Sequence, residues 1–123
     1  MVEKRLTGCR VLVVEDEWLI ALDLVEHLEE AGAIVLGPVS NVPEALETLR
    51  TLDQLPDVAS LDLKLAEGTS IRIAEELDRL GVPFIFATGT PELIPDPYRQ
   101  RVTCPKPVSA LAWLDALAGM MAA

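Results

Sequence analysis

The chain has 123 residues, enough for one compact domain, and half of them are hydrophobic, so it can bury a core. Its formal net charge of −10 argues against a nucleic-acid partner, because such partners need clustered Lys and Arg. It has no uncharged apolar run of 18 residues and no apolar signal segment near Met1, so we expect no membrane partner and no secretion. Two cysteines, Cys9 and Cys104, are too few for a disulfide framework, which leads us to expect a reduced, cytoplasmic protein.

Short apolar runs rich in β-branched residues alternate along the chain with longer segments of helical composition. Glycine or proline stands at most boundaries: Gly32 and Gly81 end helices, and Gly37-Pro38 closes a strand. In chain order we predict a strand at 9–14, a helix at 17–32, a strand at 33–36, a helix from Ser40 or Asn41 to about 52 with Pro43 in its first turn, a strand at 58–63, a helix from Thr69 or Ser70 to 81, strands at 83–87 and 101–104, and a helix at 108–121.

The segment between the last two strands contains Pro91, Pro95 and Pro97. Because proline inside a helix removes a hydrogen bond and clashes with the preceding turn, we predict one helical turn near Pro91 and then irregular, mobile chain. Strand–helix alternation predicts a parallel sheet with helices on both faces. The fold class is therefore α/β: a flavodoxin-like, doubly wound, five-stranded sheet of order 2-1-3-4-5 with a short or irregular fourth helix. We expect a single domain over residues 1–123, with its core at about 9–121 and no output domain.

Polar side chains stand where the predicted strands end. Glu15 and Asp16 follow the first strand, and Asp62 lies in the third. Thr88 stands at the end of the fourth strand, and Lys106 follows the fifth. In open parallel sheets, ligands bind in the crevice at the carboxyl ends of the strands. We therefore expect these five side chains to project into one site.

The three acidic residues predict a metal site, because carboxylates that share a pocket repel one another unless a cation or a proton compensates them. Mg²⁺ prefers oxygen ligands and usually takes one or two carboxylates beside phosphate. We expect Asp16 and Asp62 to bind Mg²⁺ directly or nearly so, and Glu15 to bind it through water. The backbone carbonyl of Lys64 could complete the set. The simpler alternatives are an acidic helix N-terminus at Glu15 and Asp16 and a chain-turning Asp62.

The same groups suit phosphoryl transfer. A carboxylate such as Asp62 can act as a nucleophile and form an aspartyl phosphate, while the protein positions groups and neutralises charge. Lys106 supplies a positive charge for one phosphoryl oxygen, and the Thr88 hydroxyl can donate to another. Each residue alone is a weak signal, since Thr-Gly is usually a turn and Lys between prolines is usually a loop. Their order along the chain, one per strand end, predicts that Asp62 is the phospho-acceptor.

The chain thus resembles the receiver domain of response regulators over nearly its whole length. The resemblance rests on Val-Val-Glu-Asp-Glu at 13–17, Leu-Asp-Leu at 61–63 with Gly68 downstream, Ala-Thr-Gly at 87–89 and Lys-Pro at 106–107. It implies a two-component signalling protein that takes a phosphoryl group from a histidine kinase with Mg²⁺ and then switches conformation or relays the group to an unidentified downstream partner. Such a protein is not a turnover enzyme. The resemblance also implies a cis Lys106-Pro107 bond.

Residues 83–89, Pro-Phe-Ile-Phe-Ala-Thr-Gly, are similar to the PFxFATG(Y) signature of a stand-alone receiver subgroup. That similarity implies a bacterial protein, mainly alphaproteobacterial, paired with an HWE-type or related histidine kinase. Two positions depart from the pattern: Thr90 replaces the usual Tyr, and Thr103 stands where receivers often have an aromatic switch residue. We therefore expect the proline-rich segment after Thr90 to carry the conformational response.

Two apolar helices are candidate partner surfaces. In the first, Trp18, Leu22 and Val25 stay partly exposed if the stripe that faces the sheet contains Ile20, Leu24, Leu28 and Ala31. Because this helix docks on the histidine kinase in receivers, these three are candidate docking residues. The last helix has few polar side chains, which makes a homodimer through the fifth strand and this helix a second prediction.

Three other functions compete with this one. A pseudo-receiver would bind partners without phosphorylation, and it would be expected to lack one of the acidic or lysine residues, none of which is missing. A hydrolase of the haloacid dehalogenase group needs a second acid two residues after its nucleophile, where this chain has Lys64. A flavodoxin-like cofactor binder is disfavoured, because the acidic loop after the first strand would repel a flavin phosphate.

Overall fold

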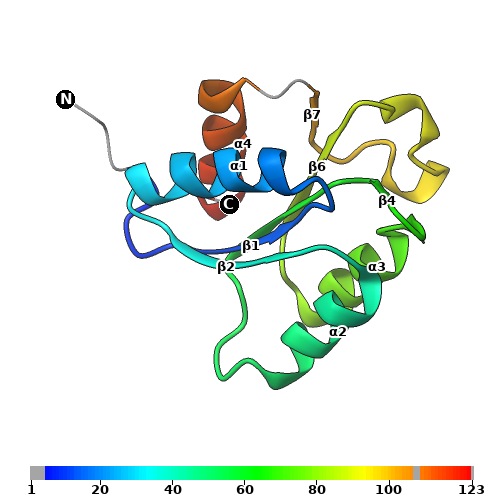
Figure 1. Cartoon of the computed structure of the whole chain (residues 1–123), viewed down its shortest axis with the longest axis horizontal. Coiled ribbons are helices and arrows are strands. Elements are labelled where there is room, and N and C mark those ends of the chain that lie inside the picture. The colour runs from blue at the N-terminus through cyan, green and yellow to red at the C-terminus, as the bar shows by residue number, and fades with distance from the viewer. Residues whose placement is uncertain (1–4, 107–108, 123) are drawn as a thin grey trace.

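The computed structural model, drawn in Figure 1, describes residues 5–106 and 109–122. Its main sheet contains β1 (Arg10–Val14), β2 (Ile34–Val39), β3 (Val58–Leu61), β6 (Phe84–Thr88) and β7 (Thr103–Pro105). All four neighbouring pairs are parallel, and the order is β2-β1-β3-β6-β7. In the sequence of these five strands, that order is 2-1-3-4-5, which confirms the predicted fold class.

Four helices cover the two faces of this sheet: α1 (Trp18–Glu30), α2 (Val42–Thr51), α3 (Ile71–Leu80) and α4 (Ala110–Ala122). Figure 1 shows α1 and α4 on one side of the strands and α2 and α3 on the other. Each layer buries its own apolar cluster, and successive residues of β1 contribute to opposite clusters. The strands are therefore apolar on both faces, which is why they could be recognised in the sequence as continuous runs.

The second strand is longer than predicted. We expected Gly37-Pro38 to close it, but β2 continues to Val39. Gly37 has a φ of +94°, and the pairing with β1 shifts register there, so the strand absorbs an irregularity and then resumes. Pro38, which follows a cis peptide bond, is tolerated because β2 is an edge strand. The resumed strand matters for the site, since the amide of Glu15 donates to the carbonyl of Val39 at 2.9 Å.

The third strand is shorter than predicted. We expected it to include Asp62 and Leu63, but β3 ends at Leu61, so that Asp62 is the first residue beyond it. A small antiparallel hairpin then follows, formed by β4 (Lys64–Leu65) and β5 (Gly68–Thr69). Two-residue strands leave no periodic pattern in a sequence, and the hairpin was therefore missed.

The proline-rich segment forms no α-helix, as predicted. It contains two 3₁₀ turns, η1 (Pro91–Leu93) and η2 (Asp96–Tyr98), of which only the first was expected. Ile94 and Tyr98 are buried, and the Tyr98 ring packs against Phe84 and Phe86 of β6 with centroid distances of 6.0 and 6.1 Å. The segment is thus tied to the sheet by its own apolar side chains. Its mobility stays a prediction.

The remaining boundaries agree with the sequence to within a few residues. Asn41 caps α2 by accepting from the Glu44 amide at 2.8 Å, and Ser70 precedes α3 but makes no side-chain cap. Both cysteines are buried and free. The predicted cis Lys106-Pro107 bond lies outside the described residues. Among the helices of the described ranges, none combines the length and apolarity needed to cross a membrane.

Candidate functional site

The predicted site residues meet at one edge of the sheet, beyond the carboxyl ends of the strands. Glu15 and Asp16 directly follow β1, and Asp62 directly follows β3. Thr88 is the last residue of β6, and Lys106 follows β7. The Lys106 amide donates to the Thr88 carbonyl at 3.0 Å, which continues the pairing of these strands past their ends. Parallel topology therefore brings together residues that are up to 91 positions apart.

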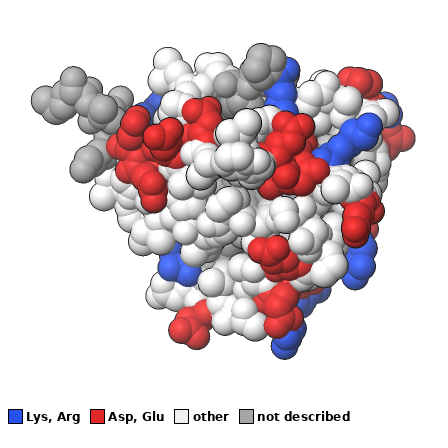
Figure 2. Space-filling model, in the orientation of Figure 1, with Lys and Arg blue, Asp and Glu red and all other residues white. Residues whose placement is uncertain are grey.

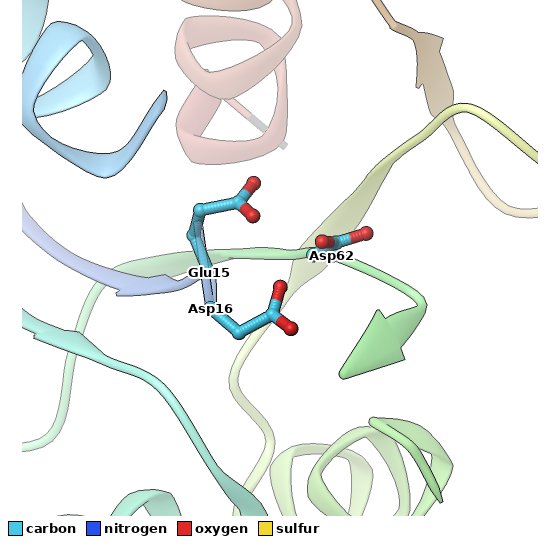
Figure 3. A group of neighbouring side chains, drawn as sticks. All are labelled: Glu15, Asp16 and Asp62. Carbon is cyan, nitrogen blue, oxygen red and sulfur yellow. The ribbon is translucent and has the colours of Figure 1, made fainter. Parts of the chain in front are cut away.

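The three acidic side chains form a compact cluster. One carboxylate oxygen each from Glu15, Asp16 and Asp62 lies within 4.8 Å of the other two. Figure 3 shows Glu15 and Asp16 leaving the chain in opposite directions, with Asp62 presented from the end of the neighbouring strand β3. Glu15 and Asp62 are only 2% and 7% exposed, whereas Asp16 is half-buried. Buried carboxylates are costly without a cation, so the cluster requires compensation.

Lys106 supplies part of that compensation. Its Nζ donates to Glu15 Oε1 at 2.6 Å and to Asp62 Oδ2 at 3.1 Å. Burial by itself lowers the pKa of Lys106, but the hydrogen bonds to Glu15 and Asp62 outweigh burial and raise this pKa above its usual value. Lys106 therefore stays protonated and joins two of the three acids.

Glu15 has a raised pKa. Its pKa rises from 4.5 to about 7 in total: burial raises it most, the hydrogen bond from Lys106 lowers it, and the neighbouring Asp62 raises it. The amide of Glu17 also donates to Glu15 Oε2 at 3.2 Å. Burial thus disfavours the charged form of Glu15, which Lys106 only partly offsets.

Thr88 lies beside the acids but donates to none of them in this structure. It is buried, and its Oγ1 accepts from the amide of Thr90 at 3.0 Å and lies 3.2 Å from the Thr90 hydroxyl. Sequence reasoning missed this contact, since Thr90 was noted there only as a departure from a motif. The available signal was a second hydroxyl two residues after Thr88, within reach of a local hydrogen bond.

A shallow hollow of about 340 Å³ opens over the cluster. It is lined by Asp16, Glu17, Asp62, Lys64, Leu65, Thr88, Gly89, Thr90 and Lys106. The possible metal ligands in this cluster are carboxylate oxygen atoms, which fit a hard divalent cation such as Mg²⁺ rather than a softer transition metal. The hollow leaves room for a bound group on the solvent side of Asp62.

The predicted docking residues lie apart from the acids, on α1. Trp18 and Leu22 are 68% and 52% exposed, and Val25 is half-buried. Leu19, which sequence reasoning did not select, is 67% exposed. The stripe facing the sheet was predicted correctly: Leu24, Leu28 and Ala31 are buried, and the half-buried Ile20 packs against the same cluster. Ala21, which was not selected, is buried as well.

Comparison with known proteins places this geometry in a family. No family model matches the chain. It is 34% identical over 84 residues to the phyllosphere-induced regulator PhyR of Methylorubrum extorquens, a match that covers 67% of this chain and 31% of PhyR. Among solved structures, SdrG from Sphingomonas melonis Fr1 is 35% identical over 93% of this chain and 97% of its own, with a TM-score of 0.78. The HemR receiver domain from Leptospira biflexa is 26% identical over 94% and 96%, with a TM-score of 0.76.

The chain belongs to the receiver-domain family of response regulators. The match spans about a third of the length of PhyR, one of several curated regulators that this chain resembles. Family membership supports a role in two-component signalling. It also gives the acidic cluster a context, since receiver domains typically bind Mg²⁺ through acidic residues.

Proposed function

We propose that this receiver domain accepts a phosphoryl group on Asp62 from a histidine kinase. The observation that carries the proposal is the position of the Asp62 carboxylate. It lies within 4.8 Å of two further acids, 3.1 Å from the Lys106 ammonium and at the floor of an open hollow. A carboxylate held between the Lys106 ammonium and a solvent-facing space is well placed to act as a nucleophile.

In the proposed step, an Asp62 carboxylate oxygen forms a bond to the phosphorus atom of a kinase phosphohistidine. The P–N bond breaks, and its electron pair stays on the imidazole, which takes up a proton. Asp16 and Asp62 would hold Mg²⁺ with the Lys64 carbonyl, and Glu15 would hold it through water. When bound, Mg²⁺ neutralises negative charge on the phosphoryl oxygens. The chain thereby stores the phosphoryl group and is not a turnover enzyme.

Two further residues would contact the bound phosphoryl group. The Lys106 ammonium already bonds Asp62, so it can follow a phosphoryl oxygen with a small movement. The Thr88 hydroxyl would first have to give up its contact with Thr90. Exchange of this hydrogen bond gives the domain a local change that can reach the proline-rich segment, which begins at Pro91.

Partners follow from the exposed apolar surfaces. The N-terminal half of α1 follows Glu17, which lines the hollow, and exposes Trp18, Leu19 and Leu22; we propose that the kinase docks there, with Val25 at the margin. Leu111 of α4 and Val102, which precedes β7, are also exposed, which supports a homodimer through this edge of the sheet. We also propose that the chain belongs to the stand-alone receiver subgroup. Its kinase would be of the HWE type, and it would act on a downstream protein that is not identified.

Acetyl phosphate with Mg²⁺ tests the central step, because attack by Asp62 on its phosphorus atom releases acetate. Intact mass should reveal one phosphoryl adduct on the wild-type chain. The adduct should be absent in Asp62→Asn and in EDTA, and it should be retained in Asp53→Asn, which makes the same substitution at an exposed loop position. No adduct on folded wild-type protein in Mg²⁺ would instead favour a phosphorylation-independent interaction module.

A further inference from the structure

A buried polar contact joins the last helix to the strand that carries the acceptor. The indole N–H of Trp113 in α4 donates to the Ser60 hydroxyl in β3 at 2.9 Å. Trp113 is fully buried and Ser60 is 2% exposed. Around them lies the apolar cluster beneath α1 and α4, which includes Val58, Ile85 and Leu117.

This contact restricts α4 more than apolar packing can. Hydrophobic contacts are non-directional, so a helix can shift on a sheet while keeping most of its buried area. A hydrogen bond between Trp113 and Ser60 has a narrow range of length and angle. If α4 moved, both groups would be left unsatisfied in an apolar interior, where no water replaces the lost bond. The pair therefore fixes the position of α4 along β3.

Ser60 lies directly beneath the acceptor. It precedes Asp62 by two positions, and residues two apart along extended chain point to the same side. Ser60 is paired with Val13 of β1, which in turn precedes Glu15 by two positions. The hydrogen bond thus acts on the layer of the sheet immediately below the two acids that Lys106 joins.

A second contact holds Asp62 from the end of another strand. Lys106 follows β7, and its ammonium bonds both Glu15 and Asp62. Asp62 is consequently held at two points: along the chain to Ser60, whose hydroxyl accepts from Trp113, and through its own carboxylate to Lys106. Displacement of α4 would disturb the first of these two supports.

We propose that Trp113 is a positioning residue for Asp62, which acts through Ser60 to hold the acceptor carboxylate in line for attack. This inference rests on the proposed phosphorylation of Asp62 and adds a residue that never touches the phosphoryl group. It also assigns Ser60 a role beyond packing, as the acceptor that makes the indole position specific.

The test compares phosphorylation by acetyl phosphate in saturating Mg²⁺ across variants that remain folded. Trp113→Phe keeps an aromatic ring but loses the indole N–H donor, and Ser60→Ala loses the hydroxyl that accepts this hydrogen bond. Leu117→Val is the matched control, because it trims a side chain of the same helix in the same cluster and keeps both the Trp113 indole and the Ser60 hydroxyl. We expect the maximal rate to fall about tenfold in the first two variants, since small misplacements of a reacting group cost large factors in rate.

Two further readouts separate positioning from packing. The acetyl phosphate concentration that gives half the maximal rate should stay unchanged, because the substrate contacts are intact. The double variant should be no slower than either single variant, since the two residues act as one unit. Leu117→Val should stay within about twofold of the wild-type rate.

Wild-type rates in Trp113→Phe and Ser60→Ala would overturn the inference while leaving the proposed function intact. A loss in Leu117→Val as large as in Trp113→Phe would also overturn it, because core packing alone would then account for the effect. No adduct on the wild-type chain would overturn both proposals.

Discussion

At the scale of single residues, Lys106 bonds acids that a metal ion would also bind. Its ammonium bonds Glu15 and Asp62, two of the three carboxylates that would surround Mg²⁺. Lys106→Met keeps the length of the side chain but removes the charge, so the site becomes more negative. We expect Mg²⁺ to bind roughly tenfold tighter, because a nearby like charge disfavours a cation.

Calorimetric titration with Mg²⁺ measures this change. Arg50→Met is a suitable control, since it removes one exposed positive charge at the far end of α2 and leaves the cluster intact. Equal Mg²⁺ affinity in Lys106→Met and the wild type would show that the lysine does not oppose the metal.

A second prediction concerns Glu15 and the pH dependence of the free energy of unfolding in the absence of metal. Its pKa is raised from 4.5 to about 7 in the folded state, chiefly by burial. The folded state then binds more protons than the unfolded state between these values. Stability from this group is therefore full below about pH 4.5 and is lost as pH rises through 7. The loss amounts to about 3 kcal/mol, because each tenfold difference in proton affinity between the folded and unfolded states corresponds to about 1.4 kcal/mol.

Urea denaturation in EDTA, at intervals from pH 5 to pH 8, measures the effect. The wild-type free energy of unfolding should fall across this range, whereas Glu15→Gln, which cannot ionise, should show a much smaller fall. Parallel profiles for the two chains would mean that Glu15 does not titrate in this range.

At the scale of elements, β2 depends on one glycine. Gly37 has a φ of +94°, and a Cβ built there would lie 2.8 Å from the Val39 amide nitrogen and 3.0 Å from the Val13 carbonyl oxygen. Gly37→Ala should therefore destabilise the fold by about 1–3 kcal/mol. Gly119→Ala in α4 is the control, because no atom lies within 4 Å of its Cβ and alanine favours a helix by about 1 kcal/mol. Urea denaturation should shift in opposite directions for the two variants, and a stable Gly37→Ala chain would contradict the clash.

Elements with a long periodic signal were predictable, and short or irregular ones were not. The strand order and the failure of an α-helix after Pro91 followed from apolar runs and proline chemistry. The extension of β2 through Gly37-Pro38 did not, because a bulge on an edge strand depends on its neighbour rather than on its own residues. The β4–β5 hairpin was too short to leave a pattern.

The candidate site was likewise predictable only in part. Its convergence was predictable, since parallel strands place Glu15, Asp16, Asp62, Thr88 and Lys106 at one edge whatever their spacing in the chain. The partners were not predictable. Lys106 bonds two acids at once, and the Thr88 hydroxyl contacts the Thr90 hydroxyl. Both contacts depend on side-chain positions that no sequence pattern encodes.

At the scale of the whole molecule, negative charge is widespread. The chain has 20 acidic and 10 basic residues, and Figure 2 shows acidic side chains in several separate groups on the visible face. Such an excess destabilises the compact state through self-repulsion. Any salt should therefore stabilise the protein to some degree, because ions screen exposed charges over about 10 Å at 0.1 M ionic strength.

A specific Mg²⁺ site should add to this general screening, which makes the comparison of two salts a test at the scale of the molecule. At equal ionic strength, MgCl₂ should raise the free energy of unfolding further than NaCl does. The difference should reach about 2.7 kcal/mol at a Mg²⁺ concentration one hundred times the Kd. Asp62→Asn should respond to both salts nearly alike, because it keeps the acidic surface but lacks one ligand of the cluster. If MgCl₂ and NaCl stabilise the wild-type chain equally, the acids at the sheet edge are only part of the diffuse negative surface and form no metal site.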